Sequence, residues 1–122
     1  MFSILNKTCK EPVKYIEQER IIIMEDDFKL INNEEAKQYE FHVEGYIPKI
    51  EYMMTKGGEI CFTHTEVPIV LEGRGIGTQL VEKSLVDVEK KNLKLVPLCP
   101  FVVGYIRKNP EWKRIVMKGI NI

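Results

Sequence analysis

Hydrophobic and polar residues alternate in the middle of the chain, as is typical of β-strands with one buried and one solvent-exposed face. Residues 39–43 alternate in this way, and residues 46–54 continue the pattern. A glycine-rich turn at residues 56–58 leads into a third alternating stretch, residues 59–66. Pro68 ends this stretch because proline has no N–H group for a ladder hydrogen bond. The pattern predicts an antiparallel meander of strands.

The chain before this meander carries a weaker pattern. Residues 28–31 form a short apolar run that predicts a strand, and Asn32-Asn33 indicates a turn. Residues 1–25 fit a short helix and a short strand equally well, so they are an N-terminal extension of undetermined structure. We expect a single domain over residues 26–122, because a chain of 122 residues has room for one hydrophobic core.

The apolar spacing becomes helical after the glycine-rich segment at residues 72–78. Polar residues occupy the opposite side of this predicted helix, and its apolar positions are Ile76, Leu80, Val81, Leu85 and Val88. An amphipathic helix is the clearest local prediction of the sequence.

Three further elements are expected after this helix. Residues 93–96 predict a short buried strand. Pro100 indicates the start of a second helix, over residues 101–108, because proline is favoured at the first helical position. Residues 112–117 predict a last strand. The order is a meander followed by β–helix–β–helix, which indicates a mixed α/β (α+β) fold.

Charge and cysteine content exclude several classes of protein. Eighteen basic residues balance eighteen acidic residues without a long block of one sign, so a nucleic-acid partner is disfavoured. No apolar stretch is long enough to span a membrane, and the N-terminal stretch lacks the features of a signal peptide. The three cysteines are widely spaced, which predicts free thiols and a reducing, cytoplasmic environment.

The glycine-rich segment reads Glu72-Gly73-Arg74-Gly75-Ile76-Gly77-Thr78. Free backbone N–H groups and the positive end of the helix dipole meet there, so the segment is a candidate anion site. Glycine would let a phosphate approach the backbone and would tolerate a positive φ angle. The segment lacks the Gly-Lys-Ser/Thr of a P-loop and fits a dinucleotide fingerprint poorly. A tight loop whose glycines only permit close helix packing is the alternative.

Three motifs follow one another in the second half of the chain. They are H-T-E-V-P at residues 64–68, G-R-G-I-G with Leu80 at residues 73–80, and P-L-C-P-F-V with Tyr105-Ile106 at residues 97–106. In this order they resemble the small, single-domain branch of the GNAT superfamily of acyl-CoA N-acyltransferases. The resemblance runs from about Phe28 to Ile115. It implies a GNAT-like fold, in which a mostly antiparallel mixed sheet is flanked by helices.

The resemblance also implies a site and a substrate. Acetyl-CoA would bind as co-substrate, without a metal, in a slot where the strand that ends at Glu66-Val67 splays from residues 93–96. Glu72 stands where the pyrophosphate loop of the superfamily often has glutamine or arginine, and it adds no favourable charge. The expected coenzyme-binding residues are Glu66, Val67, Arg74, Gly75, Ile76, Gly77, Thr78 and Tyr105.

His64 and Cys99 are the candidate catalytic residues. A primary amine must lose a proton before it attacks an acyl group, and the leaving thiolate needs a proton donor. The resemblance implies that both residues lie near the thioester. Strand alternation puts His64 beside Phe62 and opposite Cys61, so His64 and Cys61 should not share a metal. Cys99 precedes Pro100 at a helix start, which favours the thiolate, and we expect an accessible thiol. A small buried residue that only packs is the alternative for Cys99.

Two functions remain open. The first is an acetyl-CoA-dependent N-acetyltransferase that acts on a primary amine, either directly or through Cys99. The second is a non-catalytic acyl-CoA-binding or protein-interaction module, because a fold does not determine a function. The sequence does not identify the amine acceptor, and we expect a monomer or a weak homodimer.

Overall fold

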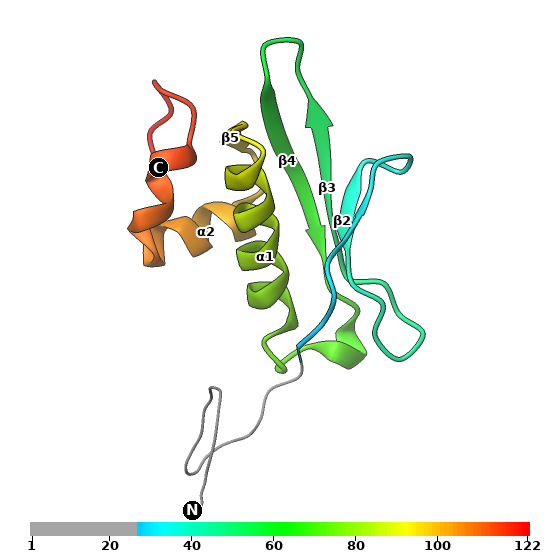
Figure 1. Cartoon of the computed structure of the whole chain (residues 1–122). Coiled ribbons are helices and arrows are strands. Elements are labelled where there is room, and N and C mark those ends of the chain that lie inside the picture. The colour runs from blue at the N-terminus through cyan, green and yellow to red at the C-terminus, as the bar shows by residue number, and fades with distance from the viewer. Residues whose placement is uncertain (1–26) are drawn as a thin grey trace, which may run out of the picture.

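The computed structural model describes residues 27–122, which form a five-stranded mixed sheet and two main helices (Figure 1). The N-terminal extension, residues 1–25, lies outside the described residues. The strands are β1 (Ile31–Asn33), β2 (Gln38–Glu40), β3 (Lys49–Met54), β4 (Glu59–Glu66) and β5 (Lys94–Pro97). The helices are α1 (Ile76–Lys90) and α2 (Pro100–Lys108), with the 3₁₀ helices η2 (Ile69–Leu71) and η3 (Pro110–Ile115).

The strands lie side by side in chain order, from β1 to β5. The pairs from β1 to β4 are antiparallel, whereas β5 runs parallel to β4 after the crossover through α1. This arrangement confirms the expected mixed, mostly antiparallel sheet with flanking helices.

Helix α1 packs an apolar stripe against one face of the sheet. Its fully buried positions include Leu80, Val81, Leu85 and Val88, as the helical spacing predicted. They join a core with strand residues that include Tyr39, Ile50, Ile60, Phe62 and Leu95. Burying one such aliphatic side chain contributes about 1.5–3 kcal/mol. This packing holds α1 against β4. It therefore fixes both ends of the connection between them, residues 67–75.

Tyr39 connects β2 to α1 through its hydroxyl, which donates a 2.6 Å hydrogen bond to Asp87. Burial raises the pKa of Tyr39, and the Asp87 carboxylate raises it further. Burial alone would also raise the pKa of Asp87, but the hydrogen bonds from Tyr39 and Lys91 outweigh it and lower this pKa below its usual value. Asp87 therefore stabilises the fold in its ionised form.

The N-terminal strands differ in their bounds from the prediction. β1 includes both Asn32 and Asn33, and the turn follows the strand because the Asn33 side chain accepts a 3.0 Å hydrogen bond from the Ala36 N–H. β2 ends at Glu40, before the predicted residue 43. Beyond it the chain leaves the regular ladder and makes a tight turn at Glu44-Gly45, where both residues have positive φ angles.

The predicted last strand, residues 112–117, is wrong. Pro110 occupies the first position of the 3₁₀ helix η3, and the carbonyl of Asn109 accepts a 3.0 Å hydrogen bond from the Trp112 N–H. Trp112 and Ile115 then pack into the core from this helix. Only Val116 bridges the sheet, at Leu95.

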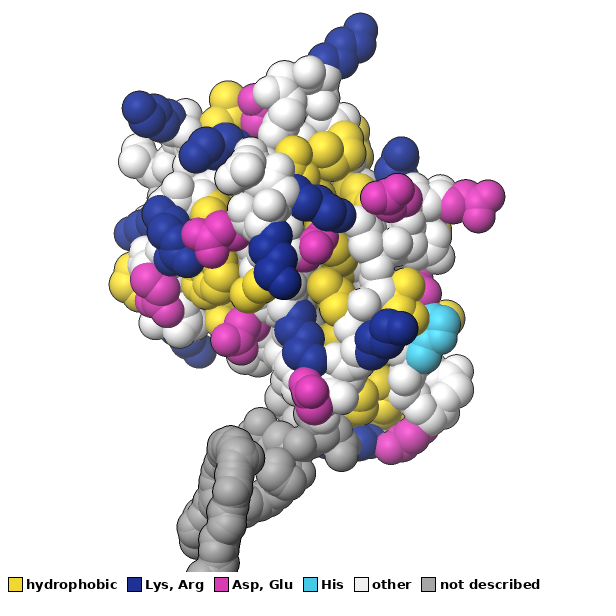
Figure 2. All heavy atoms as spheres, in the orientation of Figure 1, with side chains coloured by type: hydrophobic (Ala, Val, Ile, Leu, Met, Phe, Trp, Pro, Cys, Tyr) yellow, Lys and Arg dark blue, Asp and Glu magenta, His cyan; other side chains and the backbone are white. Residues whose placement is uncertain are grey.

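Charged side chains of both signs are interspersed over the face of the molecule shown in Figure 2. Within residues 27–122, no helix combines the length and the apolar character that a membrane span requires.

Candidate functional site

Strand β5 ends opposite the middle of β4. The parallel pairing of these two strands ends at Phe62 and Pro97, whereas the pairing of β4 with β3 continues to Glu66. The carbonyl of Phe62 accepts 3.0 Å hydrogen bonds from the N–H groups of both Leu98 and Cys99, which turn the chain into α2. Residues 63–66 consequently have a neighbouring strand on one side only. The expected splay of the two strands is not seen, because β5 pairs with β4 over its whole length and β4 extends beyond the end of β5.

A cleft of about 530 Å³ lies next to this unpaired end of β4, a size within the usual range for ligand sites. The described residues that line it come from the end of β4, η2, the glycine segment, the start of α1 and the start of α2. They are His64, Thr65, Glu66, Val67, Leu71, Glu72, Gly73, Gly75, Ile76, Gly77, Thr78 and Phe101. The structure thus brings together His64, Glu66, Val67 and the residues 75–78 that the sequence singled out.

The glycine segment ends in the first turn of α1. Gly73 and Gly75 have φ angles of +82° and +73°, a region that residues with a Cβ rarely adopt, and Gly75 is the N-cap of the helix. The first helical hydrogen bond runs from the Gln79 N–H to the Gly75 carbonyl at 3.1 Å. The N–H groups of residues 76–78 therefore have no partner within the helix. They lie at the cleft with the positive end of the helix dipole, which suits an anion.

Gly77 is also a close-packing position. A Cβ atom placed on it would lie 3.0 Å from Cζ of Phe101 and 3.3 Å from Cγ2 of Val67, closer than ordinary carbon contacts. The packing interpretation of the glycines and the anion-site interpretation are therefore compatible. Close packing at Gly77 brings α2 and the end of β4 up to the helix start where an anion would bind.

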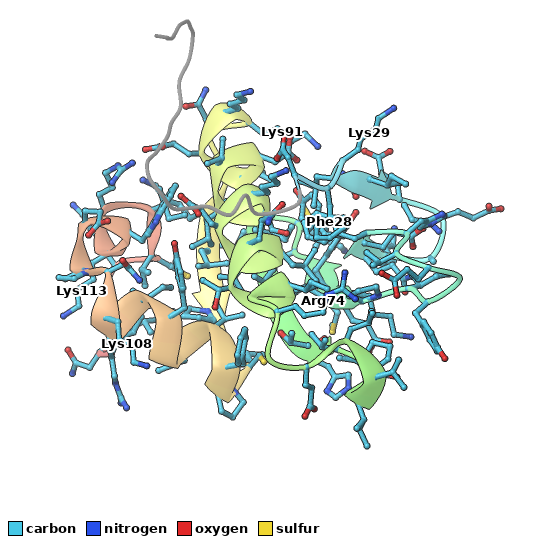
Figure 3. All side chains as sticks on the ribbon, turned by 90° about the horizontal axis from the view of Figure 1, so that it is seen from below. Phe28, Lys29, Arg74, Lys91, Lys108 and Lys113 are labelled. Atoms are coloured by element: carbon cyan, nitrogen blue, oxygen red, sulfur yellow. The ribbon has the colours of Figure 1, made fainter. Side chains whose placement is uncertain are left out.

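Arg74 does not line the cleft. Its guanidinium makes a 3.0 Å ion pair with Glu44 in the turn after β2, and Figure 3 shows it beside the start of α1. The described lining contains Glu66 and Glu72 but neither lysine nor arginine. Anion binding in this cleft would therefore depend on backbone N–H groups and the helix dipole.

A β-bulge changes the direction of side chains on β4. Glu51 lies opposite His64, but the next residue of β3, Tyr52, lies opposite Phe62, so Thr63 is an extra residue. The Thr63 hydroxyl donates a 3.2 Å hydrogen bond to the Glu51 carbonyl at this point. One inserted residue moves every later side chain to the other face of the sheet.

The prediction that His64 shares a face with Phe62 is therefore wrong. His64 points to the outer face of the sheet, away from α1, where its side chain is 58% exposed and its Nε2 lies 3.7 Å from the Glu66 carboxylate. The bulge also puts His64 on the same face as Cys61, contrary to expectation. Even so, residues 27–122 contain no group of three or more His, Cys, Asp or Glu side chains that could hold a metal ion.

Thr65 takes the inward position that was predicted for His64. It pairs with Ile50 on the helix side of the sheet, lines the cleft, and places its Oγ1 3.2 Å from the Cys99 Sγ. The sequence alone gave no sign of this contact. The alternation of residues 59–66 hides the bulge, because Thr63 and Thr65 are both polar.

Cys99 is the N-cap of α2, as the position of Pro100 predicted. Its side chain is only 4% exposed and is absent from the cleft lining, so the prediction of an accessible thiol is wrong. The short turn between β5 and α2 holds Cys99 beneath β4 through its N–H bond to Phe62.

Tyr105 lies one helical turn after Phe101 and outside the cleft lining. Burial raises the pKa of its hydroxyl, the charge of Glu82 raises it further, and a hydrogen bond with Trp112 opposes both effects. Tyr105 therefore belongs to the packing of α2 against α1 and η3. Phe101, which precedes it, is the aromatic residue of α2 that lines the cleft.

Comparison with known proteins gives one result that bears on this geometry. Residues 38–115 match the family model described as GCN5-related N-acetyl-transferase, and this match covers more than half of the chain. A comparison with curated proteins gave no match. The matched residues include β2 to η3 and every described residue of the cleft. The chain belongs to the GCN5-related N-acetyltransferase family.

Proposed function

We propose that this protein transfers the acetyl group of acetyl-CoA to a primary amine. The observation that carries the proposal is the cleft, which joins the free N–H groups at the start of α1 to the unpaired edge of β4. One ligand with an anionic end and a long, amide-containing arm suits both features. Coenzyme A has this chemistry.

The residues present fit coenzyme A in two ways. The N–H groups of residues 76–78 would hold its pyrophosphate, since phosphates bind at helix N-termini without a nearby cation. Residues 63–66 offer backbone groups that no neighbouring strand uses on the β5 side, and these would hydrogen-bond the amides of the pantetheine arm. Acetyl-CoA supplies the activated acyl group, and the chain must deprotonate the amine and protonate the leaving sulfur.

Proton removal is the demanding step for the protein. A lysine-like amine has a pKa near 10.4, so forming the neutral amine at pH 7.4 costs about 4 kcal/mol. The amine nitrogen then forms a bond to the thioester carbon, the carbon–sulfur bond breaks, and the coenzyme thiolate takes up a proton. A base for the amine and an acid for the sulfur must therefore lie near the unpaired end of β4.

We assign the base role to His64 and the acid role to Cys99. His64 is exposed at the rim of the cleft, so its imidazole can take the amine proton and release it to water. The His64 Nε2 lies 3.7 Å from the carboxylate of Glu66, which also lines the cleft. Cys99 lies on the opposite side of β4, beneath Thr65. The amine would approach from the outer face of β3 and β4, where Glu51, His64 and Glu66 are exposed or half-exposed.

A second function is favoured by the charge of the cleft. Its described lining carries two glutamates and neither lysine nor arginine, which weakens binding of a polyanion such as coenzyme A. A non-catalytic module of the same fold, which binds an acyl-CoA or another protein, would tolerate this arrangement. Turnover separates the two functions.

The test is amine-dependent release of the coenzyme thiol from acetyl-CoA, followed by mass spectrometry of the acceptor. Primary amines of three classes should be offered: a lysine-containing peptide, a linear polyamine and a small monoamine. His64→Gln should lower kcat at least tenfold, because general-base catalysis contributes about a hundredfold or more. His42→Gln is the matched control, since His42 is 57% exposed on the neighbouring sheet region but does not line the cleft. Binding of acetyl-CoA without acetylation of any amine would favour the non-catalytic module.

A further inference from the structure

We propose that Thr65 is a catalytic residue that connects the buried Cys99 thiol to the cleft and relays its proton to the coenzyme sulfur. This inference rests on the proposed acetyl transfer and identifies how an enclosed thiol can serve it. Among the described residues, Thr65 lines the cleft and also contacts Cys99.

Cys99 does not reach the cleft directly. Its side chain is 4% exposed and does not contribute to the lining. A proton that leaves its Sγ must pass through a neighbouring polar group. The Thr65 hydroxyl, 3.2 Å away, is such a group and is itself part of the cleft wall.

The β-bulge at Thr63 creates the contact between Thr65 and Cys99. Without the extra residue at Thr63, the inward position would fall to His64 and Thr65 would point to the outer face. The Thr63 hydroxyl holds the bulge by its hydrogen bond to the Glu51 carbonyl. The local structure of β4 therefore aims a hydroxyl at the sulfur while it leaves the imidazole exposed at the rim.

The Thr65 hydroxyl has the donor and acceptor groups that a proton relay needs. Threonine donates one hydrogen bond and accepts up to two, so it can accept from Cys99 and donate to a second sulfur at the same time. When the carbon–sulfur bond of the thioester breaks, the Thr65 O–H proton moves to the coenzyme thiolate and the Cys99 S–H proton replaces it on Oγ1. The coenzyme leaves as a thiol and Cys99 becomes a thiolate. The proton lost by the amine then returns from solvent to Cys99 through the Thr65 hydroxyl, so the cycle neither gains nor loses protons.

The kinetic test uses Thr65→Val, which keeps the shape of the side chain and removes its hydroxyl, together with Thr65→Ser, which keeps the hydroxyl. Thr65→Val should lower kcat at least tenfold and leave the KM for acetyl-CoA within twofold, and Thr65→Ser should recover most of the loss. A valine that acts as wild type, or a serine as impaired as valine, would refute the relay.

A double-variant cycle separates the relay from a merely structural role. If Thr65 acts through Cys99, then Thr65→Val should change kcat less than twofold in a Cys99→Ala background. Independent, multiplicative losses of kcat in the double variant would overturn the inference.

Thiol labelling tests the contact between Thr65 and Cys99 independently of turnover. A wild type that acetylates no amine would refute the proposed function and leave this test in place. The thiolate is the form that reacts with iodoacetamide, and a hydroxyl that donates to sulfur stabilises it. Labelling of Cys99, followed by mass spectrometry, should be at least threefold slower in Thr65→Val and unchanged in Thr65→Ser. Equal rates in wild type and Thr65→Val would contradict the contact between these two side chains.

Discussion

Gly77→Ala perturbs the cleft with a single added atom. The new Cβ would lie 3.0 Å from Cζ of Phe101 and 3.3 Å from Cγ2 of Val67, whereas carbon atoms ordinarily approach to about 3.5–4.0 Å. One of these neighbours must move by a few tenths of an ångström. Phe101 can do so because its side chain is 46% exposed, and both neighbours line the cleft.

The effect on stability should be small and the effect on binding larger. Alanine is favoured over glycine in a helix by up to about 1 kcal/mol, which offsets the displacement of Phe101 in the free protein. Overpacking of a fitted site costs about 1–3 kcal/mol. Because the exposed Phe101 ring can shift, we expect the cost of Gly77→Ala to lie at the lower end of this range. We therefore expect the Kd for coenzyme A to rise about fivefold, with a change of less than about 1 kcal/mol in the free energy of unfolding.

Gly104→Ala is the matched control. Gly104 also lies within a helix, and a Cβ placed on it has no neighbour within 4 Å. This variant should gain up to about 1 kcal/mol of stability and bind coenzyme A as the wild type does. Isothermal titration calorimetry and thermal unfolding measure the two quantities. If Gly77→Ala binds coenzyme A as tightly as the wild type, or if Gly104→Ala weakens binding equally, the cleft beside Gly77 is not the coenzyme site.

Three further outcomes are expected. Thr63→Val removes the hydroxyl that holds the bulge and should cost about 1 kcal/mol in urea unfolding, with reduced turnover; unchanged stability and turnover would argue against a role for the bulge. Tyr39→Phe should cost about 1–2 kcal/mol at pH 7. Because the folded pKa of Asp87 is below its unfolded value of about 3.9, its contribution is present above that pH and is lost as the pH falls through the folded pKa. The cost of Tyr39→Phe should therefore shrink below about pH 4, and a constant cost would contradict the assignment. Iodoacetamide should label the half-buried Cys61 before the buried Cys99, and the reverse order would show that Cys99 is accessible in solution.

The sequence predicted the elements whose patterns are set by local physical chemistry. The bounds of β4 agree with the alternating stretch at residues 59–66, which a glycine turn and a proline enclose. The apolar stripe of α1 and the N1 proline of α2 are equally local signals and were confirmed. The glycine segment also lies where helix and strand spacing placed it, at the wall of the cleft.

The remaining features depend on contacts between distant residues. The bulge at Thr63 is defined by its register against β3, which no single-strand pattern reveals. Its consequence reversed the predicted direction of His64 and brought Thr65 to Cys99. Residues 112–117 were predicted to form a strand, but Pro110 and the packing of Trp112 favour a 3₁₀ helix. The burial of Cys99 likewise follows from the hydrogen bond of its N–H to the carbonyl of Phe62, 37 residues earlier in the chain.

A crystal structure of the protein with acetyl-CoA tests the central claim most directly. The account predicts that the pyrophosphate contacts the N–H groups of residues 76–78, and that the thioester lies beside residues 63–66 with Thr65 on one side and His64 on the other. Acetyl-CoA bound away from this cleft, or no bound coenzyme at millimolar concentration, would contradict it.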